Sequence, residues 1–231
     1  MGTKSNMYPA SAAQWNPFVG CLFCCLYCLR SFQLQLKRWA KNHCEGCYRF
    51  IPHEHPERLV QPLPPTHFGQ FIFTCSNSDI TFCTAEYLQK IVDRIHREKN
   101  KTFLLQSKNP RTFNRVKFPD NVILGTTIET NRDDDYAKIS KAPVPSQRYR
   151  DFLDVHHPIK MVTIEPVQEF DRDVLVEWMS NINPSLIWIG YDSRKSRLPE
   201  PPLAKVQDLY WELGSRGFNV VLKTIRKACW E

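Results

Sequence analysis

The residues best suited to chemistry in this sequence are its cysteines. The chain has 231 residues and nine cysteines. Six of the nine lie between positions 21 and 47, namely Cys21, Cys24, Cys25, Cys28, Cys44 and Cys47. A chain of this length can bury a sizeable core without disulfide support. Thiols that are clustered in a large chain, rather than spread over a small secreted one, are typical of metal binding.

The first four of these cysteines stand in the segment Gly-Cys-Leu-Phe-Cys-Cys-Leu-Tyr-Cys, residues 20–28. Within it Cys21, Cys25 and Cys28 have the spacing C-x3-C-x2-C, and Tyr27 precedes the last cysteine. This pattern resembles the signature of the radical S-adenosylmethionine (radical SAM) superfamily. The resemblance implies a [4Fe–4S] cluster on these three thiolates, with one iron left for S-adenosylmethionine. It also implies reductive cleavage of that cofactor to a 5′-deoxyadenosyl radical that acts on an unknown substrate.

The sequence around the motif narrows the resemblance. The chain is similar to a poorly characterised phage- and archaeon-associated branch of the superfamily. The similarity lies in Trp15-Asn-Pro-Phe-Val-Gly-Cys21, His55-Pro-Glu-Arg-Leu59 and the strand endings at 127–130 and 164–166. Cys75-Ser-Asn-Ser-Asp79 stands where the superfamily has a Gly-Gly-Glu-type strand end. The expected activity is that of a radical SAM enzyme, which also needs an electron donor to reduce the cluster.

A zinc site competes with this interpretation. Cys25-x2-Cys28 and Cys44-x2-Cys47 are 15 residues apart, and the pair Cys21/Cys24 also has a structural zinc spacing to Cys44. Zinc ribbons place ligand pairs on turns between short strands, whereas residues 29–42 predict a helix. The cluster interpretation is therefore favoured. The alternative is a non-catalytic, zinc-stabilised protein that binds nucleic acid.

Cys44 and Cys47 stay outside the three-cysteine motif. His53 and His55 follow closely, so these four residues could form a second metal site. Two cysteines and two histidines suit zinc, and an auxiliary iron–sulfur cluster is the other option.

The remainder of the chain alternates between strands and helices. Strands are predicted at 69–75, 102–107, 121–129, 160–165, 186–190 and 219–223, with another near residue 15. Helices are predicted at 84–100, 148–156, 171–182 and 202–216, and residues 52–65 read as irregular. The strands are continuous apolar runs, which is typical of a parallel sheet covered on both faces. We expect an α/β fold, a partial (β/α) barrel of about six parallel strands with outer helices. It would be a single domain, with a cysteine-rich region at 1–65 and the barrel at 66–231.

Function in such folds gathers at the carboxyl ends of the strands. The candidate cofactor-binding residues at these ends are Ser76, Asp79, Lys108, Glu129, Glu165 and Lys223. Glu129 and Glu165 each end a strand that must be largely buried, where an unpaired carboxylate is costly. We therefore expect a ligand or a basic partner, such as Lys108 or Lys223, beside each glutamate.

The charge of the chain permits an anionic substrate. Lys and Arg exceed Asp and Glu by 31 to 24. Two groups of basic residues would make the barrel mouth positive. One group lies on the helix after the motif and the other at strand ends, namely Lys37, Arg38 and Lys41, and Lys108, Lys223 and Arg226. A nucleic acid or nucleotide substrate is expected on this ground. Lacking a recognisable signal peptide or a run long enough for a bilayer, the chain is expected to be cytosolic, with no membrane partner.

Overall fold

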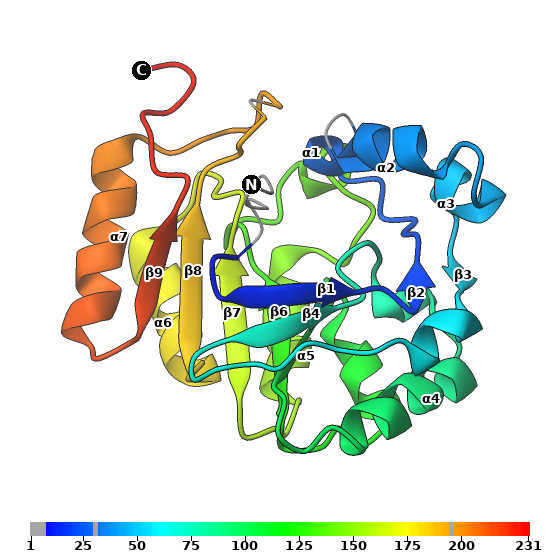
Figure 1. The fold of residues 1–231 in the computed structure, drawn as a ribbon. Coiled ribbons are helices and arrows are strands. Elements are labelled where there is room, and N and C mark those ends of the chain that lie inside the picture. Colours follow the sequence, from blue (N-terminus) through cyan, green and yellow to red (C-terminus); the bar gives the residue numbers. More distant parts are fainter. Residues whose placement is uncertain (1–7, 30–31, 195) are drawn as a thin grey trace.

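The structure is a computed structural model, and it describes residues 8–29, 32–194 and 196–231 (Figure 1). Seven parallel strands form one sheet in the order β1-β4-β5-β6-β7-β8-β9. They are β1 (Ser11–Trp15), β4 (Phe71–Thr74), β5 (Phe103–Gln106), β6 (Val122–Thr127), β7 (Lys160–Ile164), β8 (Leu186–Gly190) and β9 (Val220–Lys223). In Figure 1, β1 and β4 run across the view while β7, β8 and β9 run up it, so the sheet curves strongly. The predicted partial barrel is confirmed, with the strand near residue 15 as its seventh member.

Four helices cover the outer face of the sheet. They are α4 (Ala85–His96), α5 (Pro145–Leu153), α6 (Arg172–Ile182) and α7 (Leu203–Ser215). Thr84 caps α4, because its Oγ1 accepts a hydrogen bond from the Tyr87 amide at 3.2 Å. The helix predicted at 148–156 instead runs from Pro145 to Leu153. Proline is well suited to the first turn of a helix, where its missing amide hydrogen is not needed.

Apolar side chains fill both faces of the sheet. The larger core lies between the strands and the outer helices and includes Ile72, Leu105, Val162 and Leu209, all fully buried. A smaller cluster joins Tyr8 to Phe71, Phe73, Leu104, Met161 and Trp188 on the other face. Because both faces are covered, the strands read as unbroken apolar runs in the sequence.

The cysteine-rich region lies beyond the carboxyl ends of the strands (Figure 1). It contains β2 (Phe18–Val19) paired antiparallel with β3 (His53–Glu54), and the helices α1 (Leu26–Leu29), α2 (Phe32–Ala40) and α3 (Glu45–Arg49). The helix predicted at 29–42 is thus α2 with α1 before it, and residues 30–31 lie outside the described residues. The prediction of an irregular 52–65 segment is partly wrong, because β3 and a 3-10 helix at Pro56–Val60 occupy it. Across the described ranges, every helix is too short or too polar to cross a membrane.

Candidate metal and cofactor site

The three cysteines of the motif lie together at the barrel mouth. Cys25 is buried, and Cys21 and Cys28 pack beside it with Phe23 and Tyr27. Cys24 is exposed and has a positive φ of 51°, which turns it out of this group. The local chain path therefore turns Cys24 out to solvent and leaves Cys21, Cys25 and Cys28 packed together, and their binding of a cluster stays a prediction.

The electrostatics at Cys25 favour a thiolate. A hydrogen bond from Cys28, together with the nearby Lys108 ammonium and opposed by burial, lowers the pKa of Cys25 to about 5. Lys108 Nζ lies 3.6 Å from Cys25 Sγ. Ser140 Oγ lies 3.1 Å from the same sulfur. The thiolate is the form of cysteine that binds metal, so the surroundings of this residue suit a metal ligand.

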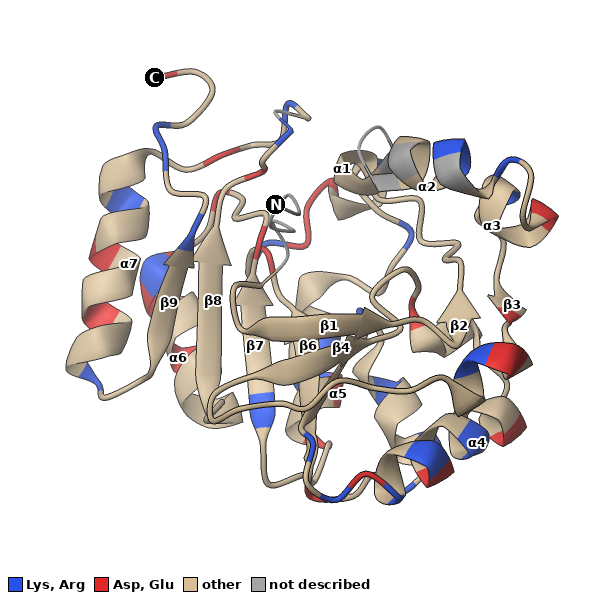
Figure 2. Ribbon diagram, viewed as in Figure 1, with Lys and Arg blue, Asp and Glu red and all other residues tan. Residues whose placement is uncertain are grey.

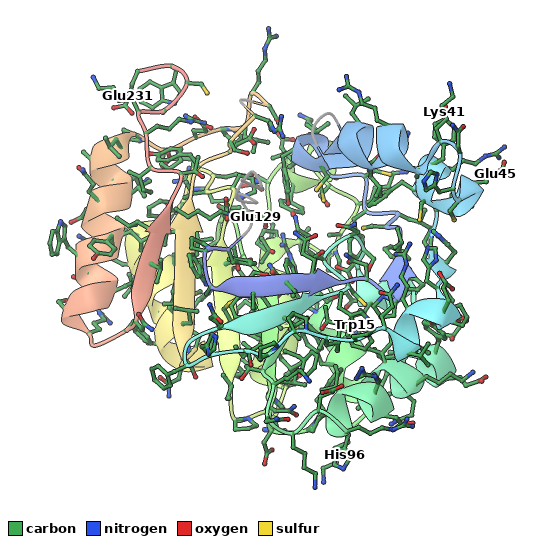
Figure 3. The ribbon with its side chains drawn as sticks, viewed as in Figure 1. Trp15, Lys41, Glu45, His96, Glu129 and Glu231 are labelled. Atoms are coloured by element: carbon green, nitrogen blue, oxygen red, sulfur yellow. The ribbon has the colours of Figure 1, made fainter. Side chains whose placement is uncertain are left out.

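Glu129 is the electrostatic centre of the site, and Figure 3 places it in the interior of the molecule below α1. It follows β6 and is fully buried. Its Oε1 accepts hydrogen bonds from Lys108 Nζ at 2.5 Å, Tyr27 Oη at 2.5 Å and Tyr136 Oη at 3.2 Å. Its Oε2 accepts from Arg148 Nη1 at 2.7 Å. The expected basic partner is therefore present.

Burial by itself would raise the pKa of Glu129, but the Arg148 and Lys108 charges outweigh it and hold that pKa below its usual value. The carboxylate is thus ionised and connects Lys108 to the barrel wall. Sequence reasoning missed Arg148, which is fully buried on α5. The feature of the sequence that could have identified Arg148 is its position as a basic residue on the apolar side of a predicted helix.

Glu165 is the other glutamate predicted at a strand end; it is partly buried, and its expected partner is also present. Lys223 Nζ donates to Glu165 Oε2 at 3.0 Å. Burial raises the pKa of Glu165 although the Lys223 charge acts against it. Lys223 also lies over the Tyr8 ring, 5.1 Å from the ring centre to Nζ.

Tyr8 connects the two halves of the mouth, and sequence reasoning did not identify it. Its hydroxyl donates to Gln106 Oε1 at 2.8 Å and lies 3.1 Å from Thr163 Oγ1. Gln106 Nε2 donates in turn to Thr127 Oγ1 at 2.8 Å. These polar side chains line neighbouring strands on the inner face, and they bridge the Glu129 and Glu165 sides of the barrel.

Asp79 and Ser76 are two further candidates for cofactor binding, and both form hydrogen bonds with other groups of the protein. Asp79 accepts hydrogen bonds from Ser107 Oγ at 2.6 Å, the Lys108 amide at 2.8 Å and the Thr81 amide at 2.9 Å. Ser76 Oγ donates to Asn16 Oδ1 at 3.1 Å. Asp79 therefore positions the backbone of Lys108, and a direct contact of Ser76 or Asp79 with a cofactor stays a prediction.

The predicted positive charge at the barrel mouth is wrong for the cations at the strand ends, because each of them is paired with a carboxylate. Lys108 pairs with Glu129, Lys223 with Glu165, and Arg226 Nη2 with Glu200 Oε1 at 2.5 Å. Figure 2 shows Lys and Arg along α2 and toward α3 in the cysteine-rich region, and of these Arg38 and Lys41 are exposed. Lys41 points away from the molecule (Figure 3). Buried or partly buried carboxylates thus neutralise the cations that the sequence places at the strand ends.

The other predicted metal group is also brought together. The ligand atoms of Cys44, Cys47, His53 and His55 all lie within 4.8 Å of one another. Cys44 caps α3 and Cys47 lies within it, while His53 lies in β3 and His55 follows it. Strand β3 pairs with β2, the strand directly before the three-cysteine loop.

Comparison with known proteins gives a likeness of fold. No protein-family model matches the chain, and no curated protein matches it. Crystal structures of SuiB from Streptococcus suis match with TM-scores of 0.52 to 0.53 at 9% sequence identity. They cover 94% of this chain and 49 to 51% of SuiB, so the chain spans about half the length of these structures. One SuiB structure is bound to the precursor peptide SuiA and another to S-adenosylmethionine.

Proposed function

We propose that this protein is a radical SAM enzyme whose [4Fe–4S] cluster is held by Cys21, Cys25 and Cys28. The observation that carries the proposal is the meeting of these three thiols, with Lys108 and Glu129 behind them, at the carboxyl edge of a partial barrel. The same fold occurs in SuiB, a protein whose structure is known with S-adenosylmethionine bound.

The donor set fits the proposed group. Three thiolates hold three irons of a four-iron cluster and leave the fourth open to a small-molecule ligand. The chemistry that this group supplies when bound is the one-electron cleavage of S-adenosylmethionine, after reduction by an electron donor. Cys28, Phe23 and Tyr27 pack around Cys25 and limit the access of water.

The residues behind the thiols would set charge and position. Lys108 places one positive charge between Cys25 and Glu129, which offsets part of the negative charge of a thiolate-bound cluster. Glu129 accepts from four protein donors and so serves as the anchor of Lys108. Glu165, with an 18% exposed side chain, is the carboxylate available to a hydroxyl or amine of the cofactor or substrate.

A peptide is the substrate class that we propose over nucleic acid. The SuiB structure with a bound precursor peptide supports this choice for the shared fold. The pairing of Lys108, Lys223 and Arg226 with carboxylates also removes the positive mouth that would attract phosphates.

The experiment is anaerobic reconstitution of the full chain with iron and sulfide. We expect about four irons per chain, and slow release of 5′-deoxyadenosine from S-adenosylmethionine after reduction. Cys21→Ala, Cys25→Ala and Cys28→Ala should each lose iron and cleavage. Cys24→Ala is the matched control, since that thiol is exposed, and should keep both. A fully loaded cluster that neither binds nor cleaves S-adenosylmethionine would refute the proposal.

A further inference from the structure

The Cys44, Cys47, His53 and His55 group has the geometry of a single-ion site. His53 Nε2 lies 3.4 Å from Cys44 Sγ and 3.3 Å from Cys47 Sγ. His55 Nε2 lies 3.2 Å from Cys47 Sγ. A tetrahedral zinc ion with ordinary bond lengths separates sulfur and nitrogen ligands by about 3.6 Å. The observed distances are close to that value, so the four atoms surround a space of the size of one ion.

The outer nitrogens of the two imidazoles are already engaged. His53 Nδ1 donates to the Ile51 carbonyl at 2.8 Å, and His55 Nδ1 donates to Glu57 Oε1 at 2.8 Å. In a neutral imidazole this places the free lone pair on Nε2, which is the atom that faces the sulfurs. Such outer partners are the usual means by which a protein orients histidine ligands.

The two thiol hydrogens can serve only two of the three short sulfur–nitrogen contacts. If Cys44 donates to His53 and Cys47 donates to His55, the contact between Cys47 Sγ and His53 Nε2 has no hydrogen in it. Cys47 is 1% exposed and His55 is 6% exposed, so water offers little compensation. A bound cation would satisfy every inward lone pair at once.

The chemistry of the four donors selects zinc. Two sulfurs and two nitrogens in a tetrahedron suit Zn²⁺. A two-iron cluster with the same residue types places its cysteines on one iron and its histidines on the other. That division would separate sulfur from nitrogen, whereas here both imidazoles touch the same Cys47 sulfur.

We propose that Cys44, Cys47, His53 and His55 bind one structural zinc ion that holds the cysteine-rich region together. All four positions are filled by protein, which leaves none open for substrate. Among the side chains that the structure describes, the local core is small, with Val19, Ala40 and Cys47 as its buried members. A core of this size supplies little folding energy, and metal binding is the usual supplement.

The site also reaches the three-cysteine loop through the chain. His53 pairs with Val19 in the β2–β3 ladder, and Gly20 and Cys21 follow at once. The Ile51 carbonyl that orients His53 also lies against Gly20. A zinc ion on His53 would therefore fix the strand from which Cys21 projects.

Metal counting tests the proposal without any assay of cofactor cleavage. We expect about one tightly bound zinc per chain in the full-length protein, and the same content in the triple variant Cys21→Ala/Cys25→Ala/Cys28→Ala. His53→Ala and His55→Ala should each lose the zinc. His67→Ala, a change at an exposed histidine, is the control and should keep it.

Cobalt substitution provides the spectroscopic signature. Cobalt(II) bound in place of zinc should give the thiolate charge-transfer bands and intense visible bands of tetrahedral coordination, and His53→Ala should abolish them. Removal of the metal by a chelator should open residues 41–60 to protease while the barrel stays resistant. Wild-type protein without stoichiometric zinc, a weak octahedral cobalt spectrum, or iron in the triple variant would each overturn the assignment. Unchanged protease resistance after zinc removal would overturn the structural role.

Discussion

At the residue scale, the molecule depends most on the charges around Glu129. Arg148 and Glu129 are both fully buried and lie 2.7 Å apart, and Lys108 completes the group. Arg148 Nε and Nη2 are buried with no hydrogen-bond partner in the part of the chain that the structure describes. Glu129 is thus the carboxylate that offsets one fully buried cation, Arg148, and one partly buried cation, Lys108. Losing one member of such a group leaves uncompensated charge.

Glu129→Gln should therefore destabilise the protein strongly. The change keeps the shape of the side chain but removes the charge that Arg148 and Lys108 share. We expect a loss of about 3–5 kcal/mol in the free energy of unfolding, measured by urea titration. Glu86→Gln is the control, because its pair with Lys90 is exposed on α4, and it should leave the unfolding midpoint unchanged. Equal effects of the two substitutions would contradict the central role of Glu129.

The effect of Glu129→Gln on stability should also depend on pH. The pKa of Glu129 is held below its ordinary value of 4.5, so the ionised carboxylate stabilises the folded state above that pH. This contribution is lost as the pH falls through the lower, folded-state pKa. The stability difference between wild type and Glu129→Gln should be constant from pH 7 to about 5 and shrink below about 4.5. Urea titrations at a series of pH values measure it, and a difference that grows on acidification would contradict the assignment.

At the scale of elements, the junction between β2 and the three-cysteine loop leaves no room for a side chain at Gly20. Gly20 has a φ of +103°, and a Cβ added there would lie 2.2 Å from the Ile51 carbonyl oxygen. Its amide donates to the Asn77 carbonyl at 3.0 Å, so Gly20 also ties the loop to the end of β4. Only glycine satisfies both the backbone angle and the close approach.

Gly20→Ala should destabilise the protein and disturb the loop. We expect a loss of about 1–3 kcal/mol in the free energy of unfolding from backbone strain, with a larger loss if the contact with Ile51 opens. The matched control is Gly214→Ala in the exposed face of α7, where an added Cβ meets nothing within 4 Å. That change should stabilise by about 0.5–1 kcal/mol. Thermal or urea unfolding of both variants measures this, and a neutral Gly20→Ala would show that the junction is not constrained.

At the scale of the whole molecule, the sheet has a rigid centre and a weaker end. Strands β5, β6 and β7 each pair with neighbours on both sides and are largely buried. Strand β9 pairs with β8 alone among the described strands and is partly exposed along its length. Local opening is therefore easier at β9 than at the centre.

Hydrogen exchange of the backbone amides should follow this gradient. We expect amides of β6 to exchange on the order of a hundredfold more slowly than those of β9. Mass spectrometry of peptides from the two strands would measure the rates. Protection of β9 equal to that of β6 would mean that the sheet opens only as a whole.

The sequence by itself determined the sheet and the residues that end its strands. Continuous apolar runs such as Phe71–Thr74 and Phe103–Gln106 can be buried only between two covering layers, so they predict a parallel sheet. A carboxylate at the end of such a run needs a donor, and both Lys108 and Lys223 fill that need. The spacing of Cys21, Cys25 and Cys28 likewise indicated three ligands, because spacing within one loop is a local property.

Only the tertiary structure decided how distant segments meet at the barrel mouth. Arg148 reaches Glu129 from α5, and Tyr8 reaches Gln106 and Thr163 from the beginning of the described chain. Arg226 pairs with Glu200, and this pair neutralises a positive charge that the sequence analysis expected to attract an anionic substrate. Periodicity reports on the nearest few residues, whereas these contacts depend on the curvature of the sheet, which brings the ends of separate strands to one place.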